Sequence, residues 1–181
     1  MLALMSGIWG ASYLLIKYAL RDLSEPMIVF CRTALATVAL LVLIRFQGKE
    51  TMQALRDVRR RPGAAFALGL TAIGLPFILI TYGERTVPSG LTAVLIASAP
   101  IFIAIFAPFL DRSEVMSGPQ WVGLMVGLAG LVLLVGVEQV HSVGAFFGAL
   151  AMIGAAASYG VSGFILKRTF SGMPPVVTTV V

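Results

Sequence analysis

The stretch GIWGASYLLIK, residues 7–17, has a second copy, SYGVSGFILK, at residues 158–167. An aromatic residue, a glycine, a serine and a lysine recur at one spacing: Trp9 pairs with Tyr159, Gly10 with Gly160, Ser12 with Ser162 and Lys17 with Lys167. Each copy of a repeated segment predicts one structural unit. We therefore expect two related halves, with these stretches in equivalent positions.

The composition predicts a protein that is embedded in lipid. Of the 181 residues, 59% are hydrophobic and only 12% are charged, whereas soluble domains carry about 25% charged residues. The formal net charge is +5, but most lysines and arginines lie between apolar runs, which favours a role in membrane topology over nucleic-acid binding. Cys31 is the only cysteine and the chain has one histidine, so neither a disulfide framework nor a metal site is expected.

Six apolar runs approach the roughly 20 residues that a membrane-spanning helix needs. They cover Leu2–Leu20, Pro26–Ile44, Gly63–Tyr82, Pro88–Leu110, Pro119–Val137 and Gly144–Leu166. A seventh run starts at Met173 and reaches Val181, a length of only about 13 Å as a helix. We expect an all-helical polytopic membrane protein with six spans and the start of a seventh, and we interpret the chain as part of a longer protein.

The basic residues predict the orientation of these helices. Six of the thirteen lysines and arginines lie in the segment between the second and third runs: Arg45, Lys49, Arg56, Arg59, Arg60 and Arg61. Positive charge favours the cytoplasmic side, which places this segment and the N-terminus in the cytoplasm. Arg112, Lys167 and Arg168 then fall on the same side.

This orientation makes the repeat an inverted one. The two copies are separated by five crossings, an odd number, so the second copy runs through the membrane in the opposite direction. Inverted repeats are typical of secondary transporters, in which two halves move about a site near the midplane. Lys17 is expected at the outer end of its helix and Lys167 at the inner end.

The ordered motifs resemble those of the EamA family of the drug/metabolite transporter superfamily. They are WGAS at 9–12 with Lys17, Arg32, VPSGLTAVL at 87–95, APIF at 99–102, Glu114 with QWVG at 120–123, and GLAGL at 127–131. The resemblance implies a ten-helix protein of two five-helix repeats, many of whose relatives export metabolites or amino acids. It implies a first repeat over residues 1–138 and the incomplete start of a second over residues 144–181.

Several residues of the apolar runs are candidates for a substrate cavity. Trp9, Ser12 and Tyr13 are three and four residues apart and share a helix face, which suits either a cavity lining or helix packing. Pro76 and Pro100 each remove a backbone donor, as in the broken helices that line transporter cavities, although a plain kink fits equally well. Further candidates are Ser98, beside Pro100, and Tyr159, although tyrosines near helix ends are also typical of the interfacial aromatic belt.

Charged residues inside or next to the spans are few. Arg32 is the only charge well inside a predicted span, and such a charge is a functional candidate by default. A structural tether that reaches the outer interface, a backbone carbonyl or another helix is the favoured interpretation. Glu84 and Arg85 stand together at a helix end and are expected to be solvated. The first run contains no carboxylate, so proton coupling through the first repeat is not expected.

These patterns favour a secondary transporter, most simply an exporter of small metabolites or amino-acid-like solutes in a bacterial inner membrane. A membrane scaffold or sensor subunit is the alternative. An enzyme is not expected, because the spans lack a catalytic constellation. No cofactor and no nucleic-acid partner is expected. The expected partners are a small-molecule substrate and the lipid bilayer, with a homodimer as a further option.

Overall fold

The computed structural model describes residues 2–46, 49–114, 116–135, 142–174 and 177–178, and its regular elements are all helical. The order is α1 (Leu2–Ala19), α2 (Glu25–Phe46), α3 (Lys49–Arg59), α4 (Pro62–Gly69), a π-helical turn η1 (Leu70–Gly74), α5 (Leu75–Gly83), α6 (Ser89–Ile96), α7 (Ala99–Leu110), a 3₁₀ turn η2 (Arg112–Glu114), α8 (Gly118–Val135) and α9 (Val143–Phe170). No strand occurs in these ranges, which confirms the prediction of an all-helical chain.

Four helical segments of the described chain are long and apolar enough to cross a membrane: Glu25–Phe46, Pro62–Gly83, Ser89–Leu110 and Val143–Phe170. They correspond to four of the predicted runs, and α1 and α8 occupy the positions of two others. Many large apolar side chains lie on the surface, among them Phe30, Leu35 and Phe109. Extended apolar surfaces of this kind suit contact with lipid or with another membrane segment.

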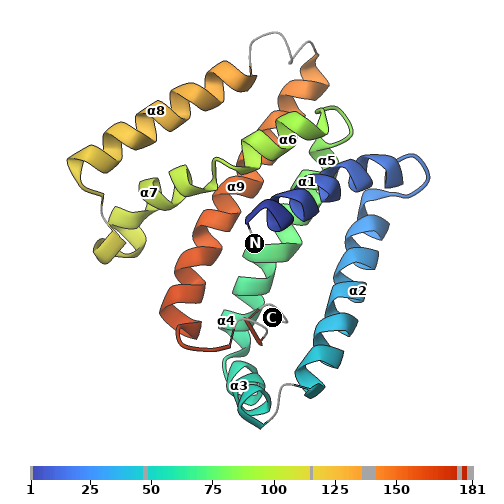
Figure 1. Ribbon diagram of the computed structural model, residues 1–181, viewed down its shortest axis with the longest axis vertical. Helices are drawn as coiled ribbons and strands as arrows, with labels where there is room; N and C mark the ends of the chain where they lie inside the picture. Colours follow the sequence, from blue (N-terminus) through green and yellow to red (C-terminus); the bar gives the residue numbers. More distant parts are fainter. Residues whose placement is uncertain (1, 47–48, 115, 136–141, 175–176, 179–181) are drawn as a thin grey trace.

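Helix α9, which carries the second copy of the repeated stretch, is the centre of the packing. It contacts α5, α6 and α7, whereas α2 and α8 lie at the two sides of the molecule (Figure 1). α1 packs on α6 and runs obliquely to α2 (Figure 1).

Two glycines set the distance between α5 and α9. A Cβ atom on Gly83 would lie 2.8 Å from Gly148 O, and one on Gly148 would lie 3.3 Å from Gly83 O. Small residues at helix crossings let the backbones approach closely, which is the main source of packing energy between helices in lipid.

The span Pro62–Gly83 changes its winding just before Pro76. In the π turn η1 each N–H pairs with the carbonyl five residues back, as Leu75 N–H does with Leu70 O. The next residue, Pro76, has no N–H to give to Thr71 O. Ser158 on α9 donates its hydroxyl to that carbonyl at 2.8 Å, so the defect is compensated by a neighbouring helix.

The span Ser89–Leu110 is interrupted at residues 97–98, between α6 and α7. Pro100 lies in the first turn of α7, where its missing N–H costs little. Ser98 is buried and donates to Leu95 O at 2.6 Å, which pairs one of the carbonyls at the end of α6. At both prolines the regular helix is interrupted, and a nearby hydroxyl donates to a backbone carbonyl. The hydroxyl is that of Ser158 on α9 near Pro76, and that of Ser98 in the same span near Pro100.

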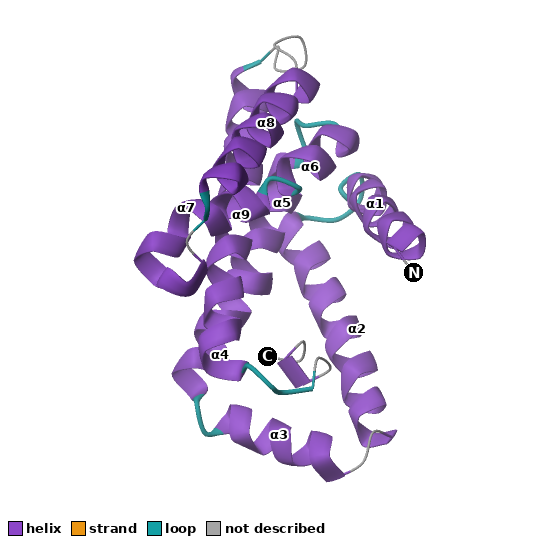
Figure 2. Ribbon diagram, turned by 60° about the vertical axis from the view of Figure 1, so that its left-hand side comes forward, coloured by secondary structure: helices purple, strands orange, loops and turns teal. Residues whose placement is uncertain are grey.

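The connections between helices gather at two opposite ends of the molecule. At one end Arg85 pairs with Glu25 at 2.5 Å, and Thr86 donates to Gly144 O at 3.0 Å. At the other end Arg61 donates to Thr169 O at 2.6 Å. There α3 lies crosswise to α2 (Figure 2) and buries Val58 against Phe170 and Leu68. The basic segment between the second and third apolar runs therefore contains a packed helix, α3.

The glycine contact gives a first prediction. Gly83→Ala places a methyl group 2.8 Å from a backbone oxygen, so the helices must separate, and we expect a loss of about 1–3 kcal/mol in the free energy of unfolding. Gly163→Ala is the control, because Gly163 lies on α9 with open space around it and alanine favours helix by about 1 kcal/mol. Denaturant titration in detergent measures both, and equal effects would contradict the close-contact account.

Candidate functional site

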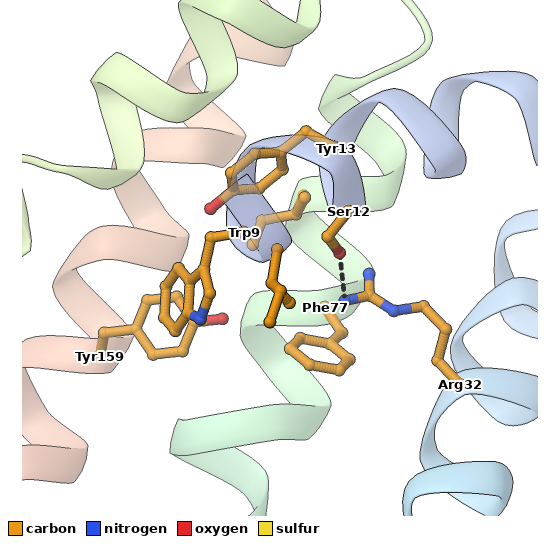
Figure 3. Close-up of a pocket in the computed structure, with 8 residues that line it drawn as sticks. Trp9, Ser12, Tyr13, Arg32, Phe77 and Tyr159 are labelled. Carbon is orange, nitrogen blue, oxygen red and sulfur yellow. Dashed lines mark hydrogen bonds between the residues drawn. The ribbon is translucent and has the colours of Figure 1, made fainter. Parts of the chain in front are cut away.

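A pocket of about 270 Å³ lies between α1, α2, α5 and α9. Its lining combines aromatic, apolar and polar side chains (Figure 3): Ile8, Trp9, Ser12 and Tyr13 from α1, Arg32 from α2, Phe77 and Ile80 from α5, and Tyr159 from α9. A mostly apolar concavity with a few converging polar groups is the usual form of a small-molecule site. Five residues proposed from the sequence, Trp9, Ser12, Tyr13, Arg32 and Tyr159, therefore lie together.

Arg32 is held at the pocket by two contacts. Its Nη2 donates to Ser12 Oγ at 3.0 Å, and its guanidinium carbon lies 4.4 Å from the centre of the Phe77 ring (Figure 3). The hydrogen bond joins α2 to α1, and the ring contact joins α2 to α5. Arg32 thus forms a tether between helices and also presents its charge to the pocket.

The charge on Arg32 is not neutralised by a carboxylate in the described part of the chain. The ion pairs found there involve Arg60, Arg85 and Lys167. A cation inside an apolar span normally pairs with an anion or with backbone carbonyls. The guanidinium has five N–H groups in a fork that matches a carboxylate, so the pocket has spare donor capacity for an anionic group.

The aromatic residues shape both the pocket and its approach. Tyr13 is 8% exposed, whereas Trp9 is 59% exposed and lies at the edge of the pocket. Trp9, Phe77 and Tyr159 also line an adjoining groove of about 630 Å³ between α2 and the segment α4–η1. The two equivalent aromatic residues of the repeat, Trp9 and Tyr159, therefore face the same space.

The structure places the other cavity candidates elsewhere. Ser98 and Pro100 line a separate groove of about 580 Å³, between α6–α7 and α8, together with Gly123 and Gly127. Pro76 is fully buried in α5 next to Phe77 and does not line the pocket. In the described chain a Cβ atom on Gly123 or Gly127 would meet no neighbour within 4 Å.

The two motif lysines each fasten a helix to a connection at one end of the molecule. Lys17 Nζ donates to Val87 O at 2.9 Å, just before α6. Lys167 contacts Glu114, and it lies 3.1 Å from both Asp111 Oδ2 and Ser113 Oγ, after α7. Hydrogen bonds from the Ser113 hydroxyl, followed by those from Lys167, lower the pKa of Asp111 to about 2. This carboxylate therefore stays ionised at any physiological pH.

Glu84 corrects one expectation from the sequence. It was expected to be solvated at a helix end, but its exposed fraction is 0%. Pro76, Ile80 and Glu84 are spaced by four residues and all three are buried, so they share the inner face of the helix. That spacing was the signal in the sequence, together with the adjacent Gly83 that lets α9 approach. Phe77 and Ile80 of the pocket were missed because nothing distinguishes them from ordinary packing residues.

Comparison with known families agrees with the sequence motifs. The model of the EamA-like transporter family matches residues 1–136. The chain belongs to this family. The resemblance inferred from the ordered motifs is thereby confirmed.

Individual relatives cover most of the chain. An uncharacterized transporter of Bacillus subtilis, YoaV, is 28% identical over 90% of this chain and 54% of its own length. A second one from that organism, YdfC, is 29% identical over 73% of this chain and 41% of its own length. The uncharacterized inner membrane transporter YedA of Escherichia coli is 29% identical over 70% of this chain and 40% of its own length. The chain thus spans about half, or less, of the length of these relatives. No solved structure matches it.

The Arg32–Ser12 hydrogen bond gives a second prediction. A double-mutant cycle with Arg32→Ala and Ser12→Ala should give a coupling free energy of about 1.5–3 kcal/mol, the usual range for a hydrogen bond to a charged group. The matched control pairs Ser12→Ala with Arg45→Ala, an exposed arginine in the last turn of the same helix, for which we expect no coupling. Unfolding titrations of the purified protein measure both cycles. A coupling near zero for Arg32 would contradict the tether.

Proposed function

We propose that this protein is a secondary transporter that moves small organic solutes by alternating access between two inverted five-helix halves. The observation that carries the proposal is the pocket beside Arg32, in which the equivalent aromatic residues Trp9 and Tyr159 both take part. In transporters built from inverted repeats, the substrate site lies near the midplane between the repeats. Membership of a family of EamA-like transporters supports the same function.

The proposed architecture has ten helices. Residues 1–138 form the first repeat, and residues 144–181 begin the second. Of these ranges, residues 1, 47–48, 115, 136–138, 175–176 and 179–181 lie outside the described part of the chain. In this proposal the chain holds six spans and the start of a seventh. The gathering of alternate connections at opposite ends supports this order of crossings.

The proposed location is a bacterial inner membrane, with the N-terminus in the cytoplasm. The arginines of α3 and Arg61 lie at the same end as Lys167 and Arg168, and such a concentration of positive charge favours the cytoplasmic side. The name of the relative from Escherichia coli supports an inner membrane.

The proposed substrates are amino-acid-like metabolites, and the proposed direction is export, which the family resemblance suggests. The guanidinium of Arg32, which forms no ion pair with the described residues, suits a carboxylate. The rings of Trp9, Phe77 and Tyr159 suit an apolar side chain. Ser12 contributes a hydroxyl next to the charge.

The proposal is tested by flux of radiolabelled amino acids into proteoliposomes that contain the protein expressed from its complete reading frame. We expect saturable flux for at least one amino acid. Arg32→Gln should lower kcat/KM by about ten- to a hundredfold, because a charge-assisted hydrogen bond is worth about 1.5–3 kcal/mol. Arg45→Gln is the control and should transport like the wild type.

Two results would contradict this account. Absence of saturable flux for every amino acid tested would remove the proposed transport of amino-acid-like solutes. Saturable flux that Arg32→Gln leaves unchanged would keep transport but remove the assignment of Arg32 as the carboxylate partner.

A further inference from the structure

The carboxyl group of Glu84 is enclosed where four helices meet. Glu84 follows the span Pro62–Gly83 at the end of α5, and its side chain has no exposed surface. Oε2 accepts a hydrogen bond from Ser89 Oγ at 2.9 Å. Oε1 is buried and has no hydrogen-bond partner among the described residues. A buried oxygen without a partner is rare in a native structure and calls for an explanation.

The charged groups around Glu84 are directed to other partners. On α1, Lys17 donates to Val87 O rather than to the carboxyl, and Tyr13 is near enough for its charge to interact with that of Glu84. Arg85, the next residue, pairs with Glu25 on α2. On α9 the residues packed against the neighbouring Gly83 are Gly148 and Met152, and neither can ionise.

An ionised carboxylate at this position is therefore costly. A buried charge without a contacting counter-ion usually takes up or releases a proton instead of remaining charged. Burial raises the pKa of Glu84, and the hydroxyls of Ser89 and Thr92 and the charge on Lys17 oppose this shift without cancelling it. Because a raised pKa favours the acid form, Glu84 keeps its proton at pH values at which an exposed glutamate would lose it.

The hydrogen bonds around the carboxyl fit the protonated form. The Thr92 hydroxyl is close to the carboxyl and donates to Pro88 O at 3.3 Å. Its oxygen keeps acceptor capacity, because a hydroxyl has one donor and two acceptor sites. A carboxyl O–H can then be donated to the Thr92 hydroxyl, while Oε2 accepts from Ser89. In the ionised form Oε1 has no hydrogen-bond donor among the described residues.

We propose that Glu84 is a proton-binding site that couples solute movement to a proton gradient. The inference rests on the transport function proposed above. In the conformation described, Glu84 carries the proton. When α1 moves away from the α5–α6 connection, the Lys17–Val87 contact breaks and water reaches the carboxyl. The O–H bond of Oε1 then breaks, the proton passes to water, and the carboxylate that remains is stabilised by hydration.

The substrate pocket and the proton site are connected through one helix. Tyr13 lines the pocket and lies within electrostatic range of Glu84, and Lys17 is one turn further along α1. A solute that changes the position of α1 through the pocket therefore changes the exposure of Glu84. This sharing of α1 is what links the two binding events. Proximity of the positive Lys17 disfavours a metal cation at the same carboxylate.

The experiment uses proteoliposomes, with and without an imposed pH gradient, and the radiolabelled amino acid that shows saturable flux. For the wild type we expect the pH gradient to drive accumulation of the label at least several-fold above equilibrium. Glu84→Gln imitates the protonated acid in shape and hydrogen bonding, so it should fold. It should lose the response to the pH gradient but still exchange labelled for unlabelled solute. Glu114→Gln, at the half-exposed glutamate that contacts Lys167, is the matched control and should respond like the wild type.

A second measurement follows the proton itself and needs no substrate. Infrared spectra of the purified protein should show the carbonyl band of a protonated carboxylic acid well above the ordinary glutamate pKa of about 4.3, and Glu84→Gln should remove that band. Glu114→Gln should leave it in place.

The outcomes separate the two proposals. Saturable flux that ignores a pH gradient, or that a sodium gradient drives instead, overturns proton coupling and leaves transport standing. Absence of the infrared band, or its survival in Glu84→Gln, overturns the proton site. If the wild type shows no flux at all, the proposed transport is wrong, and the proposed coupling to protons is wrong with it. The infrared band of the protonated carboxylic acid then shows only whether Glu84 binds a proton. Glu84→Gln could also lose both solute exchange and the response to the pH gradient, while the infrared band stays unchanged. That result would show that Glu84 has a purely structural role, and it would contradict the proposal.

Discussion

The rest of the structure depends on the close approach of α5 and α9 at Gly83 and Gly148. Lipid gives helices no hydrophobic reason to associate, so backbone contact of this kind decides which helices form the centre of the molecule. The crossing brings Ser158 to the carbonyl that Pro76 leaves unpaired, and Tyr159 to the pocket. It also closes the space around Glu84, the residue that follows Gly83. The central packing and the position of Tyr159 at the pocket thus depend on one contact between two glycines.

The repeated stretch has different roles in its two copies. In the first, Ser12 accepts a hydrogen bond from Arg32, whereas its equivalent Ser162 donates to Tyr159 O within its own helix. The aromatic positions behave alike, because Trp9 and Tyr159 face the same pocket. The lysines also behave alike, since each holds a helix to a connection near the end of another helix. The shared features lie at the pocket and at the helix ends.

The sequence predicted the helical class and the approximate span limits, because an apolar run of spanning length needs only local composition. It singled out Arg32, since a charge in such a run is conspicuous. It could not assign Ser12 as the partner of Arg32, because that contact depends on how α1 and α2 pack. It missed the π turn before Pro76, which is stabilised by Ser158 from a distant part of the chain. The prediction for Glu84 was wrong for the same reason: a residue at a helix end is solvated only if no other helix covers it, and Glu84 is buried beside Ser89 and Thr92 of α6.

The central claim is that the pocket beside Arg32 is a water-filled site inside the membrane. The most direct test is thiol labelling with a membrane-impermeant maleimide, after Cys31, which is exposed, has been replaced by serine. Cysteine at Ser12 should react rapidly, because a thiol reacts as the thiolate and needs water to ionise. Cysteine at Leu15, which does not line the pocket and is 66% exposed, should remain unlabelled in lipid. Equal protection of the two positions would show that the pocket is closed packing rather than a substrate site.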